Sequence, residues 1–565
     1  MLCEIDDQLH ASGTQADVVF TPVGVGSFAQ AVVSHYKAAE RATATRVVTV
    51  EPDTAACLHA GLAEGALVTV NTQVPTIMTG LDCGTVSTNA WPILQAGIDG
   101  SMTVSDYEAH EACQMLMESG IAAGPCGAAP LAALRRLTTD EKLGLGMDHT
   151  SVIVLCCTEG HREYSTPRSV QHDDAVTLCQ ALVQINSSIP GAPGSANPGP
   201  GETEIARYIT AWLQHRDIET HWLEPTKGRP SVIGVVKGTG GGKSLMLNGH
   251  MDTVTIASYE GDALTGHIKD GKLYGRGSAD MKSGLAAILV AVAQAKQDKL
   301  PGDVIFTGVA DEEDMSLGTE QVLAAGWRAD AAVVCEPTLE DLIIAHKGFI
   351  WFEVDMHGLA AHGSRPDLGI DAISRAGYFL VELDKYAKRL LRLLDPKISK
   401  HHPLLGPGSV HASIVRGGEE PASYPAKCTV TIERRTIAGE TNDTVLAEME
   451  ALLRAAGENS GDPDGFRYDL RMTFSRNPFE IAKDHPLAKL VADQIGKVTA
   501  KDANLRAEAF WTDCALIADT GIPVVMYGPH GEGLHAKEEW VDVRSIEVVT
   551  ATLIGVLRDF TAVPR

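Results

Sequence analysis

The segment from Leu245 to Gly284 constrains this chain more than any other stretch. It begins with an apolar run, LMLNGHMDTV, that contains His250 and Asp252, and it closes with a glycine-rich turn, LYGRGSADMKSG, that carries Asp280. The apolar run is typical of a buried strand, and the glycines predict a tight turn. Imidazole and carboxylate groups delivered from separate loops are common ligands of metal ions. The segment therefore predicts an α/β domain with a metal site beside its sheet.

Three later segments repeat the pattern of an apolar run followed by metal-binding side chains. Their runs are Val304–Ala310, Ala331–Cys335 and Pro523–Tyr527. In an open α/β sheet, ligands gather outside the carboxyl ends of the strands, so we expect these side chains to meet. A set of imidazoles and carboxylates without thiolate suits Zn²⁺ with room for water, which is typical of a catalytic site. The candidate ligands are His250, Asp280, Glu313, Glu336 and His535.

With these motifs in this order and spacing, the chain from about Thr177 onward resembles a family of zinc-dependent peptidases. The family includes aminoacylases, acetylornithine deacetylases, succinyl-diaminopimelate desuccinylases and glutamate carboxypeptidases. The resemblance implies two Zn²⁺ ions, for which Co²⁺ can substitute. It implies that His250 and Glu336 bind one ion, that Glu313 and His535 bind the other, and that Asp280 bridges them.

The same resemblance implies roles for residues that do not bind metal. Glu312, beside Glu313, corresponds to the general base, and Asp252 corresponds to the carboxylate that orients His250. His362, in GLAAHGSRP, corresponds to the donor that stabilises the oxyanion, often supplied by the partner subunit. Arg435, in IERRTIAGE, is the candidate for binding a substrate carboxylate, whereas its neighbour Arg434 should point to the opposite face of a strand.

The activity implied is hydrolysis of the amide bond of N-acyl amino acids, as in acetylornithine deacetylases, by a hydroxide held between two zinc ions. A dipeptidase or carboxypeptidase of the same family is the alternative. The stretch EEPASYPAKC places Ser423 where the family often has Asn, which leaves the contacts to the substrate backbone open.

A second domain is predicted inside the hydrolase. Residues 347–478 follow the order β-α-β-β-α-β, with a long helical stretch at Asp371–Leu394, and this order is the ferredoxin-like arrangement. It divides the catalytic domain into residues 176–346 and 479–565. In the resembled family this insertion is a lid used for dimerisation, so a homodimer is expected.

Residues 1–165, followed by a junction at 166–175, show a different pattern. Gly24, Gly26 and Ser27 form a glycine-rich loop that opens a helix, a natural phosphate cradle. The series GVGS, VEP, GPCG and TEG resembles the C-terminal half of diaminopropionate ammonia-lyase, a pyridoxal-phosphate enzyme of the tryptophan-synthase-β type. We therefore expect a partial α/β domain of that type ahead of the hydrolase.

The lysine that would bind pyridoxal phosphate is missing from this segment. In the resembled family it lies upstream of the glycine loop, but no lysine precedes Gly24, and the first in the chain is Lys37. Because the cofactor needs that amine as anchor and base, pyridoxal phosphate is not expected. A structural appendage, a relic or a misjoined gene model remain open, as does a bifunctional or lyase-like protein.

The charge of the chain excludes some classes of partner. It has 47 Lys and Arg against 73 Asp and Glu, a formal net charge of −26. Such a chain repels nucleic acid and anionic membranes, so neither is expected as a partner. The acidic N-terminus lacks a secretory signal, no apolar run reaches about 18 residues, and the cysteines form no CxxC pair. These features predict a cytoplasmic protein of two to four domains.

Overall fold

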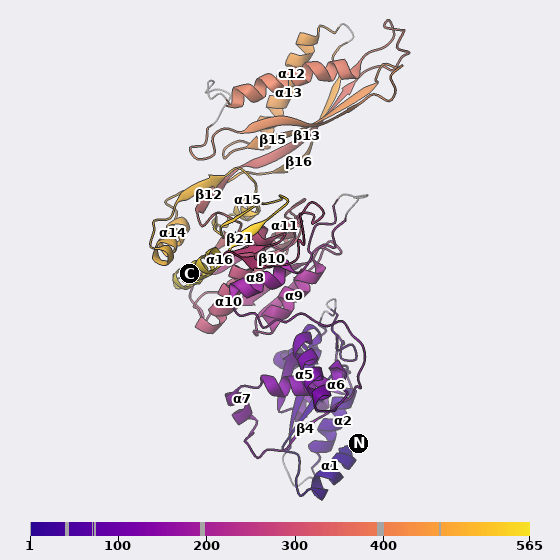
Figure 1. Cartoon of the computed structure of the whole chain (residues 1–565), viewed down its shortest axis with the longest axis vertical. Helices are drawn as coiled ribbons and strands as arrows, with labels where there is room; N and C mark the ends of the chain where they lie inside the picture. The colour runs from indigo at the N-terminus through magenta and orange to yellow at the C-terminus, as the bar shows by residue number, and fades with distance from the viewer. Residues whose placement is uncertain are drawn as a thin grey trace. The chain divides into compact units, whose positions relative to one another are not determined.

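The computed structural model describes residues 2–39, 45–70, 72, 75–191, 198–391, 401–462 and 465–564 (Figure 1). They form two compact units. One comprises Met1–His172 with Arg207–Thr220, and the other comprises Asp173–Ala206 with His221–Arg565. No helix in the described part of the chain is long and apolar enough to cross a membrane.

The first unit is built on a four-stranded parallel sheet in the order β3-β2-β1-β4. Alternate residues of its strands enter two separate cores, because side chains of a strand alternate between faces. Phe20 packs against α5 and α6, whereas Val19 packs against α2. The elements are β1 (Val18–Pro22), α2 (Ser27–Tyr36), β2 (Arg46–Pro52), β3 (Gly100–Val104), α5 (Asp106–Glu118), α6 (Pro125–Arg136) and β4 (Ile153–Leu155).

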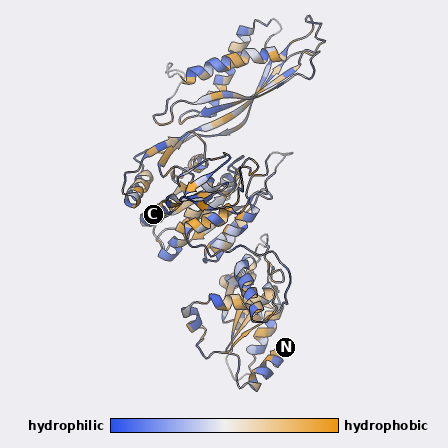
Figure 2. Ribbon diagram, in the orientation of Figure 1, coloured by the Kyte–Doolittle hydropathy of each residue, from blue (hydrophilic) through white to orange (hydrophobic). Residues whose placement is uncertain are grey.

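The second unit contains a nine-stranded mixed sheet, ordered β17-β12-β19-β11-β7-β10-β6-β5, with β18 paired to β12. Its four middle strands, β19, β11, β7 and β10, are parallel to one another, whereas the strands that flank them, β12 and β6, are antiparallel to β19 and β10. These strands are apolar and fully buried, as expected for a sheet covered on both faces, and Figure 2 shows the hydrophobic colour along them. The strands are β5 (Glu219–Leu223), β6 (Ser231–Val236), β7 (Leu245–His250), β10 (Val304–Val309), β11 (Ala331–Val334), β12 (Leu342–His346), β17 (Phe479–Glu480), β18 (Leu505–Glu508) and β19 (Val524–Met526).

Helices cover this sheet and fix its strands. Helix α10 (Ser283–Asp298) packs against β7 and β10 and against the helices α8 (Ala175–Val183) and α16 (Val543–Thr561). Helix α14 (Pro486–Thr499) packs in turn against α16. Helices α11 (Leu317–Ala324) and α15 (Cys514–Asp519) pack against β10 and β19, and helix α9 (Thr203–Gln214) is divided between the two units.

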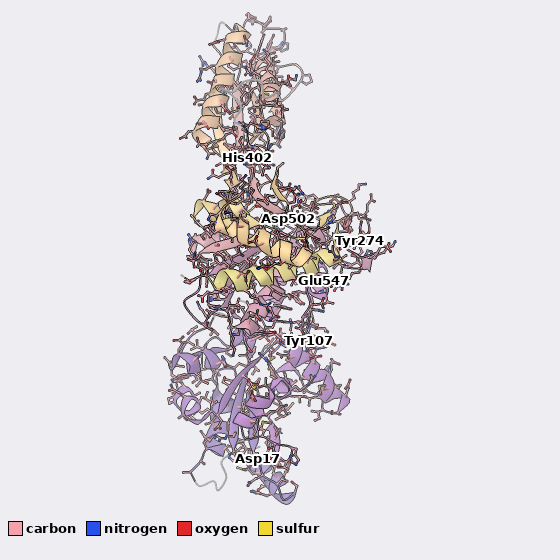
Figure 3. The ribbon with its side chains drawn as sticks, turned by 90° about the vertical axis from the view of Figure 1, so that its left-hand side faces the viewer. Asp17, Tyr107, Tyr274, His402, Asp502 and Glu547 are labelled. Carbon is pink, nitrogen blue, oxygen red and sulfur yellow. The ribbon has the colours of Figure 1, made fainter. Side chains whose placement is uncertain are left out.

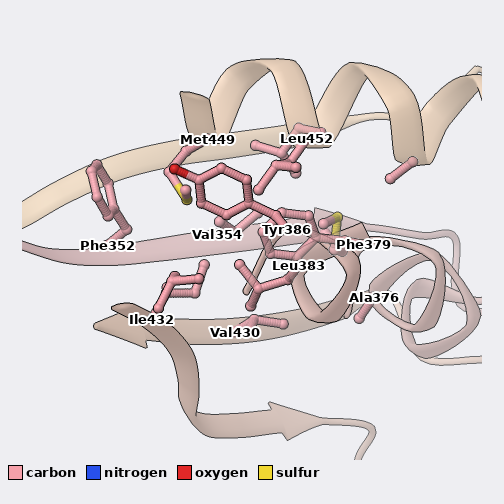
Figure 4. Packing of buried hydrophobic residues seen from close by; sticks show 14 of the residues in the cluster. Phe352, Val354, Ala376, Phe379, Leu383, Tyr386, Val430, Ile432, Met449 and Leu452 are labelled. Atoms are coloured by element: carbon pink, nitrogen blue, oxygen red, sulfur yellow. The ribbon is translucent and has the colours of Figure 1, made fainter. Parts of the chain in front are cut away.

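The predicted ferredoxin-like insertion is present as a separate antiparallel sheet in the order β14-β15-β13-β16. Two helices cover one face of this sheet. Phe379, Leu383 and Tyr386 of α12 pack against Val354 and Ile432 of the strands (Figure 4). The predicted helix end at 392–394 lies outside the described residues. The elements are β13 (Gly348–His357), α12 (Ala372–Leu391), β14 (Ser409–Gly417), β15 (Lys427–Thr436), α13 (Asn442–Ser460) and β16 (Tyr468–Arg476).

A small antiparallel sheet, ordered β20-β21-β9-β8, joins segments that are far apart in sequence. Tyr274, labelled in Figure 3, lies at the end of β9 and pairs with Trp540 of β21. The sheet therefore brings the glycine-rich turn that follows β9 next to the loop between β20 and β21. Its strands are β8 (Ile268–Lys269), β9 (Lys272–Tyr274), β20 (Gly531–Glu532) and β21 (Trp540–Asp542).

A buried histidine makes the stability of the second unit depend on pH. The Nδ1 atom of His346 lies 3.0 Å from the carbonyl oxygen of Lys347, and its Nε2 atom is buried with no hydrogen-bond partner among the described residues. Burial lowers the pKa of His346 to about 4. The unfolded chain binds a proton near the ordinary pKa of about 6.5, so acid favours unfolding between pH 6.5 and 4.

The free energy of unfolding of the wild type should fall between pH 7 and pH 5, and about 2 kcal/mol of that fall comes from His346. We therefore expect the fall to be smaller by this amount in His346→Asn. Asn keeps a donor for the Lys347 carbonyl but does not titrate. Urea unfolding of the metal-free protein, followed by tryptophan fluorescence, measures the difference. His267→Asn is the control because His267 is exposed. Equal pH dependence in the wild type and in His346→Asn would contradict the assignment.

Candidate metal centre

The carboxyl ends of three of the four parallel strands carry three of the five predicted ligands, and a fourth ligand lies in a later loop. His250 ends β7, Glu313 follows β10, Glu336 follows β11, and His535 lies in a loop beyond β19. The order β19-β11-β7-β10 sets these ends side by side, as expected for an open α/β sheet. Asp280 reaches the same place from the turn after β9. The structure thus brings all five predicted ligands together.

His250 is the centre of one group of side chains. Its Nε2 atom lies 3.0 Å from Oδ1 of Asp280 and 3.7 Å from Oε1 of Glu336. His250 is fully buried, and the Glu336 side chain is 5% exposed. The ligand atoms of His250, Glu312 and Glu336 lie within 4.8 Å of one another, close enough to share an ion.

His535 is the centre of the second group. Its Nε2 atom lies 2.9 Å from Oε2 of Glu313 and 3.5 Å from Oδ2 of Asp280. The two oxygens of Asp280 thus face different imidazoles, Oδ1 toward His250 and Oδ2 toward His535. The Asp280 carboxylate therefore lies between the two imidazoles. A second set of ligand atoms within 4.8 Å consists of His250, Asp280 and Glu313.

Asp252 contacts both His250 and the loop that carries Glu312 and Glu313. Its carboxylate accepts hydrogen bonds from the backbone N–H groups of Glu312, at 3.2 Å, and Glu313, at 3.0 Å. The Nδ1 atom of His250 lies 3.0 Å from the backbone oxygen of Asp252 and 3.6 Å from its carboxylate. The backbone and the side chain of Asp252 both lie beside the His250 ring, and the carboxylate also holds the loop that carries the two glutamates.

A buried ion-pair network fixes the start of that loop. Arg229 donates to both carboxylate oxygens of Glu202, at 2.6 to 3.0 Å, and pairs with Asp311 at 2.7 Å. Asp311 has a φ of 69°. This left-handed conformation is uncommon outside glycine, and it turns the chain at the end of β10. The turn directs Glu312 and Glu313 away from the strand.

The acidic groups raise one another's affinity for protons. Burial and the charge of Asp280 raise the pKa of Glu313 and of Glu336 to about 7. Burial opposes protonation of His250, but the charge of Glu336 and a hydrogen bond with Asp280 hold its pKa well above the usual value. Hydrogen bonds to Asp280 and Glu313 raise the pKa of His535 to about 10. A cation bound here would displace these protons.

The two predicted lid residues lie away from this cluster. His362 is exposed, and its Nδ1 atom lies 2.8 Å from the hydroxyl of Ser364. Arg435 is half-buried on β15, where Nε lies 2.8 Å from Glu433 and the guanidinium stacks over Phe349 at 5.2 Å. No contact joins His362 or Arg435 to the five candidate ligands within the ranges that the structure describes.

The lid strand alternates as predicted. Arg434 is fully buried and pairs with Glu440 at 2.6 Å, on the opposite face of β15 from Arg435. Ser423, at the position where the family often has Asn, forms a bridge with His362 and donates from its hydroxyl to Glu420 at 2.6 Å.

The glycine loop of the first unit has a packing explanation. Gly26 is the N-cap of α2 with a φ of 90°. A Cβ atom on Gly24 would lie 2.9 Å from the carbonyl oxygen of Gly80, and one on Gly26 would lie 2.9 Å from Leu94. Close packing therefore requires both glycines, and the phosphate role of Gly24, Gly26 and Ser27 stays a prediction.

The first lysine lies at the far end of the same helix. Lys37 is the C-cap of α2, and its Nζ atom contacts Asp99 at 2.5 Å and the Thr45 carbonyl at 2.9 Å. A helix of ten residues is about 15 Å long, so Lys37 is remote from Gly26.

Sequence reasoning missed two residues beside the ligands. Glu539 accepts hydrogen bonds from the backbone of Ala279 and Asp280, each at 3.0 Å, and pairs with Arg276 at 2.8 Å. Both side chains are 1% exposed. The only signal in the sequence was a carboxylate shortly after His535. Because Glu538 and Glu539 are adjacent glutamates, the sequence does not show which of them contacts the ligand loop.

Comparison with known proteins identifies two families. The model of pyridoxal-phosphate dependent enzymes matches residues 1–157, which confirms the resemblance predicted for this segment. An acetylornithine deacetylase from Myxococcus xanthus is 30% identical over 333 residues, 58% of this chain and 84% of that protein. A probable succinyl-diaminopimelate desuccinylase from Staphylococcus epidermidis is 27% identical over 363 residues, 60% of this chain and 87% of that protein.

The solved structures agree with this fold. The structure of a Bacillus subtilis protein, described as a dinuclear metal-binding peptidase from the M20 family, superposes on this chain with a TM-score of 0.51 at 17% identity. The match covers 68% of this chain and 97% of that one. The predicted α/β class is confirmed. The model of peptidase family M20/M25/M40 matches residues 246–559, the segment that carries every candidate ligand, and the chain belongs to that family.

Proposed function

We propose that the chain is a two-metal amidohydrolase that cleaves the amide bond of N-acyl amino acids. The observation that carries the proposal is the excess of negative charge in the cluster, where four carboxylates surround two imidazoles. Buried charges without compensation are strongly disfavoured, so the cluster either holds protons or binds cations, and a bound cation would displace the protons. The carboxylates are Asp280, Glu312, Glu313 and Glu336, and the imidazoles are His250 and His535.

One orphaned atom supports the same conclusion. Oε1 of Glu313 is buried and has no hydrogen-bond partner among the described residues, although Oε2 contacts His535. Buried polar atoms are nearly always paired, and a metal ion would supply the missing partner. The imidazole and carboxylate donors suit Zn²⁺, with Co²⁺ as a substitute.

The ligands divide into two sets that share one carboxylate. His250 and Glu336 would hold one ion and Glu313 and His535 the other, with Asp280 between them. Two such ions supply Lewis acidity and lower the pKa of a shared water toward neutrality. A carboxylate is then needed to move the proton. The position of Glu312 supports this role, because one of its carboxylate oxygens lies within 4.8 Å of ligand atoms of His250 and Glu336, while Asp252 holds its backbone.

The lid supplies the remaining chemistry. His362 is the proposed donor to the oxyanion that forms when the amide is attacked. Arg435 is the proposed partner of the substrate carboxylate, which requires it to exchange its present contact with Glu433. The relatives that remove acetyl and succinyl groups support an N-acyl amino acid as substrate. A dipeptidase or carboxypeptidase activity is the alternative.

The lid also supports a homodimer. Strand β14 is at the edge of its sheet and exposes Ile414 and Val415, and α12 exposes Ile373, Tyr378 and Val381. An unpaired edge beside apolar side chains favours association with a second copy. We keep the predicted domain boundaries for this proposal, with the lid at 347–478 and the catalytic parts at 176–346 and 479–565. A cytoplasmic location fits the eleven free cysteines.

For the segment 1–165, which makes up most of the first unit, we propose a structural role without pyridoxal phosphate. The position of Lys37 supports this role, because its amine is engaged by Asp99 and Thr45.

Metal removal tests the proposed function. We expect the purified protein to hold up to two zinc ions per chain, measured by elemental analysis, and to release amine from N-acetyl amino acids. Dialysis against a chelator should abolish the activity, and added Zn²⁺ or Co²⁺ should restore it. Full activity in metal-stripped protein would refute the proposal. Dipeptides in the same screen separate the alternative, because preferential cleavage of dipeptides would favour the peptidase.

A further inference from the structure

The five candidate ligands do not have equal structural support. His250, Glu313 and Glu336 lie at or directly after the ends of buried strands of the nine-stranded sheet. Asp280 and His535 instead lie in irregular loops, one after β9 and the other between β20 and β21. Loops are more mobile than strands, so these two ligands need a separate device that keeps them in place.

The carboxylate of Glu539 connects both loops. Its Oε1 atom accepts the backbone N–H groups of Ala279 and Asp280, each at 3.0 Å. Its Oε2 atom accepts the N–H of Gly277 at 3.0 Å and Nη1 of Arg276 at 2.8 Å. Four donors from one turn thus converge on a single side chain that belongs to the His535 loop. No other candidate ligand loop within the described ranges shares a carboxylate in this way with Asp280.

Arg276 makes the connection reciprocal. Its Nη2 atom donates to the carbonyl oxygen of Ala536, the residue directly after His535, at 2.8 Å. The backbone adds a further link, because the N–H of Gly275 donates to the carbonyl oxygen of Glu539 at 3.2 Å. The turn that carries Asp280 is therefore hydrogen-bonded to both Ala536 and Glu539, the two ends of the segment 536–539.

The conformations of both loops explain why such a tie is needed. Gly275 and Gly277 have φ values of 148° and 80°, and His535 has a φ of 59°. A histidine in the left-handed region is conformationally costly and persists only where surrounding contacts hold it. The contacts of Ala536 and Glu539 lie one and four residues from His535, and they supply this restraint.

We propose that Glu539 is a positioning residue that holds Asp280 and His535 at a fixed separation, so that a metal ion can bind between Asp280, Glu313 and His535. The inference rests on the metal centre proposed above. Groups that orient metal ligands typically contribute 10- to 100-fold to metal affinity. Glu539 touches neither substrate nor metal, so its effect acts through the two loops.

Replacement of Glu539 by Gln tests the proposal. Gln keeps the length of the side chain, but its amide nitrogen would face the N–H of Gly277 and the guanidinium of Arg276, so half of the acceptors are lost. We expect one of the two metal sites to bind Zn²⁺ roughly 10- to 100-fold more weakly, measured by titrating metal-free full-length protein against a chromophoric chelator. The other site, with His250 and Glu336 on strand ends, should change less.

Asp330→Asn is the matched control. Asp330 also ties a loop to the backbone, because it accepts the N–H of Ser244 at 2.8 Å, but it does so at the opposite end of β7 from His250. The control should bind both ions like the wild type. Equal Zn²⁺ affinity of Glu539→Gln and the wild type would overturn the proposal, and so would an equal loss of affinity in the control.

Glu539→Gln leaves the charge of Arg276 buried without a partner, so this variant could fail to fold. A second variant tests the proposal in that event. Glu539→Gln combined with Arg276→Met removes the contacts of Arg276 and of Oε2 together with both charges, and neutral replacement of a buried ion pair is often tolerated. We expect this double variant to keep the thermal midpoint of the metal-free protein and to lose affinity at one site. A double variant that folds and binds both ions normally would refute the role of Glu539.

The wild type separates this inference from the proposed function. If wild-type protein binds no Zn²⁺, the metal centre itself is wrong. If the wild type binds two ions and the Glu539 variants bind them equally well, only the positioning role fails.

Discussion

Glu312→Gln is expected to lower the turnover rate by roughly 10²- to 10⁴-fold while metal content stays near normal, because this range is the usual contribution of a positioned general base. Gln matches glutamate in size and polarity but cannot accept the proton of the attacking water. The backbone N–H of Glu312 still donates to Asp252, so the loop keeps its conformation. Burial and the charge of Glu336 already raise the pKa of Glu312 well above its usual value, as expected of a group that binds a proton.

Glu313→Gln is the matched control because the two residues are adjacent and both donate a backbone N–H to Asp252. Oε2 of Glu313 lies 2.9 Å from His535, and a neutral amide is a poor zinc ligand. We expect this variant to lose occupancy of one ion, measured by elemental analysis after gel filtration. If Glu312→Gln loses metal and Glu313→Gln keeps it, the two roles are exchanged. Normal turnover in Glu312→Gln with both ions bound would refute the assignment of a general base.

The strand-end ligands could be predicted because a simple rule places them. Each follows a short apolar run, and parallel strands present their carboxyl ends at one edge of the sheet. His250, Glu313 and Glu336 meet for this reason. The same logic separates Arg434 from Arg435, since alternate residues of β15 face opposite sides and Arg434 is the buried one.

The residues that hold the ligand loops in place, Glu539 and Arg276, could not be predicted in the same way. Glu539 and Arg276 are 263 residues apart in sequence, and only the pairing of β9 with β21 brings them together. Two adjacent glutamates, Glu538 and Glu539, give the sequence no means of choosing between them. The carboxylate of Asp252 was expected beside His250, but its two hydrogen bonds to the backbone N–H groups of Glu312 and Glu313 could not be predicted, because they depend on the left-handed turn at Asp311.

His362→Asn is the second substitution for which we expect a large effect on catalysis. The shorter Asn side chain cannot place its amide N–H where the imidazole N–H would reach the oxyanion, and loss of one such donor typically lowers turnover by roughly 10²- to 10³-fold. His362 is exposed, and its ring contacts Ser364, so the substitution should leave both the thermal midpoint and the metal content unchanged. Single-turnover and steady-state measurements on an N-acetyl amino acid should show the loss in kcat. Ser364→Ala is the control, because it removes the partner of the ring without removing the ring.

The place of His362 outside the metal cluster raises the question of which subunit's site it serves. Mixing subunits that carry Glu312→Gln with subunits that carry His362→Asn answers it. If His362 acts on the partner subunit, each mixed dimer regains one working site, because the subunit with intact Glu312 receives the intact His362 of its partner. If His362 acts within its own subunit, both sites of the mixed dimer stay inactive. Normal turnover of His362→Asn alone would instead show that the oxyanion is stabilised without the lid histidine.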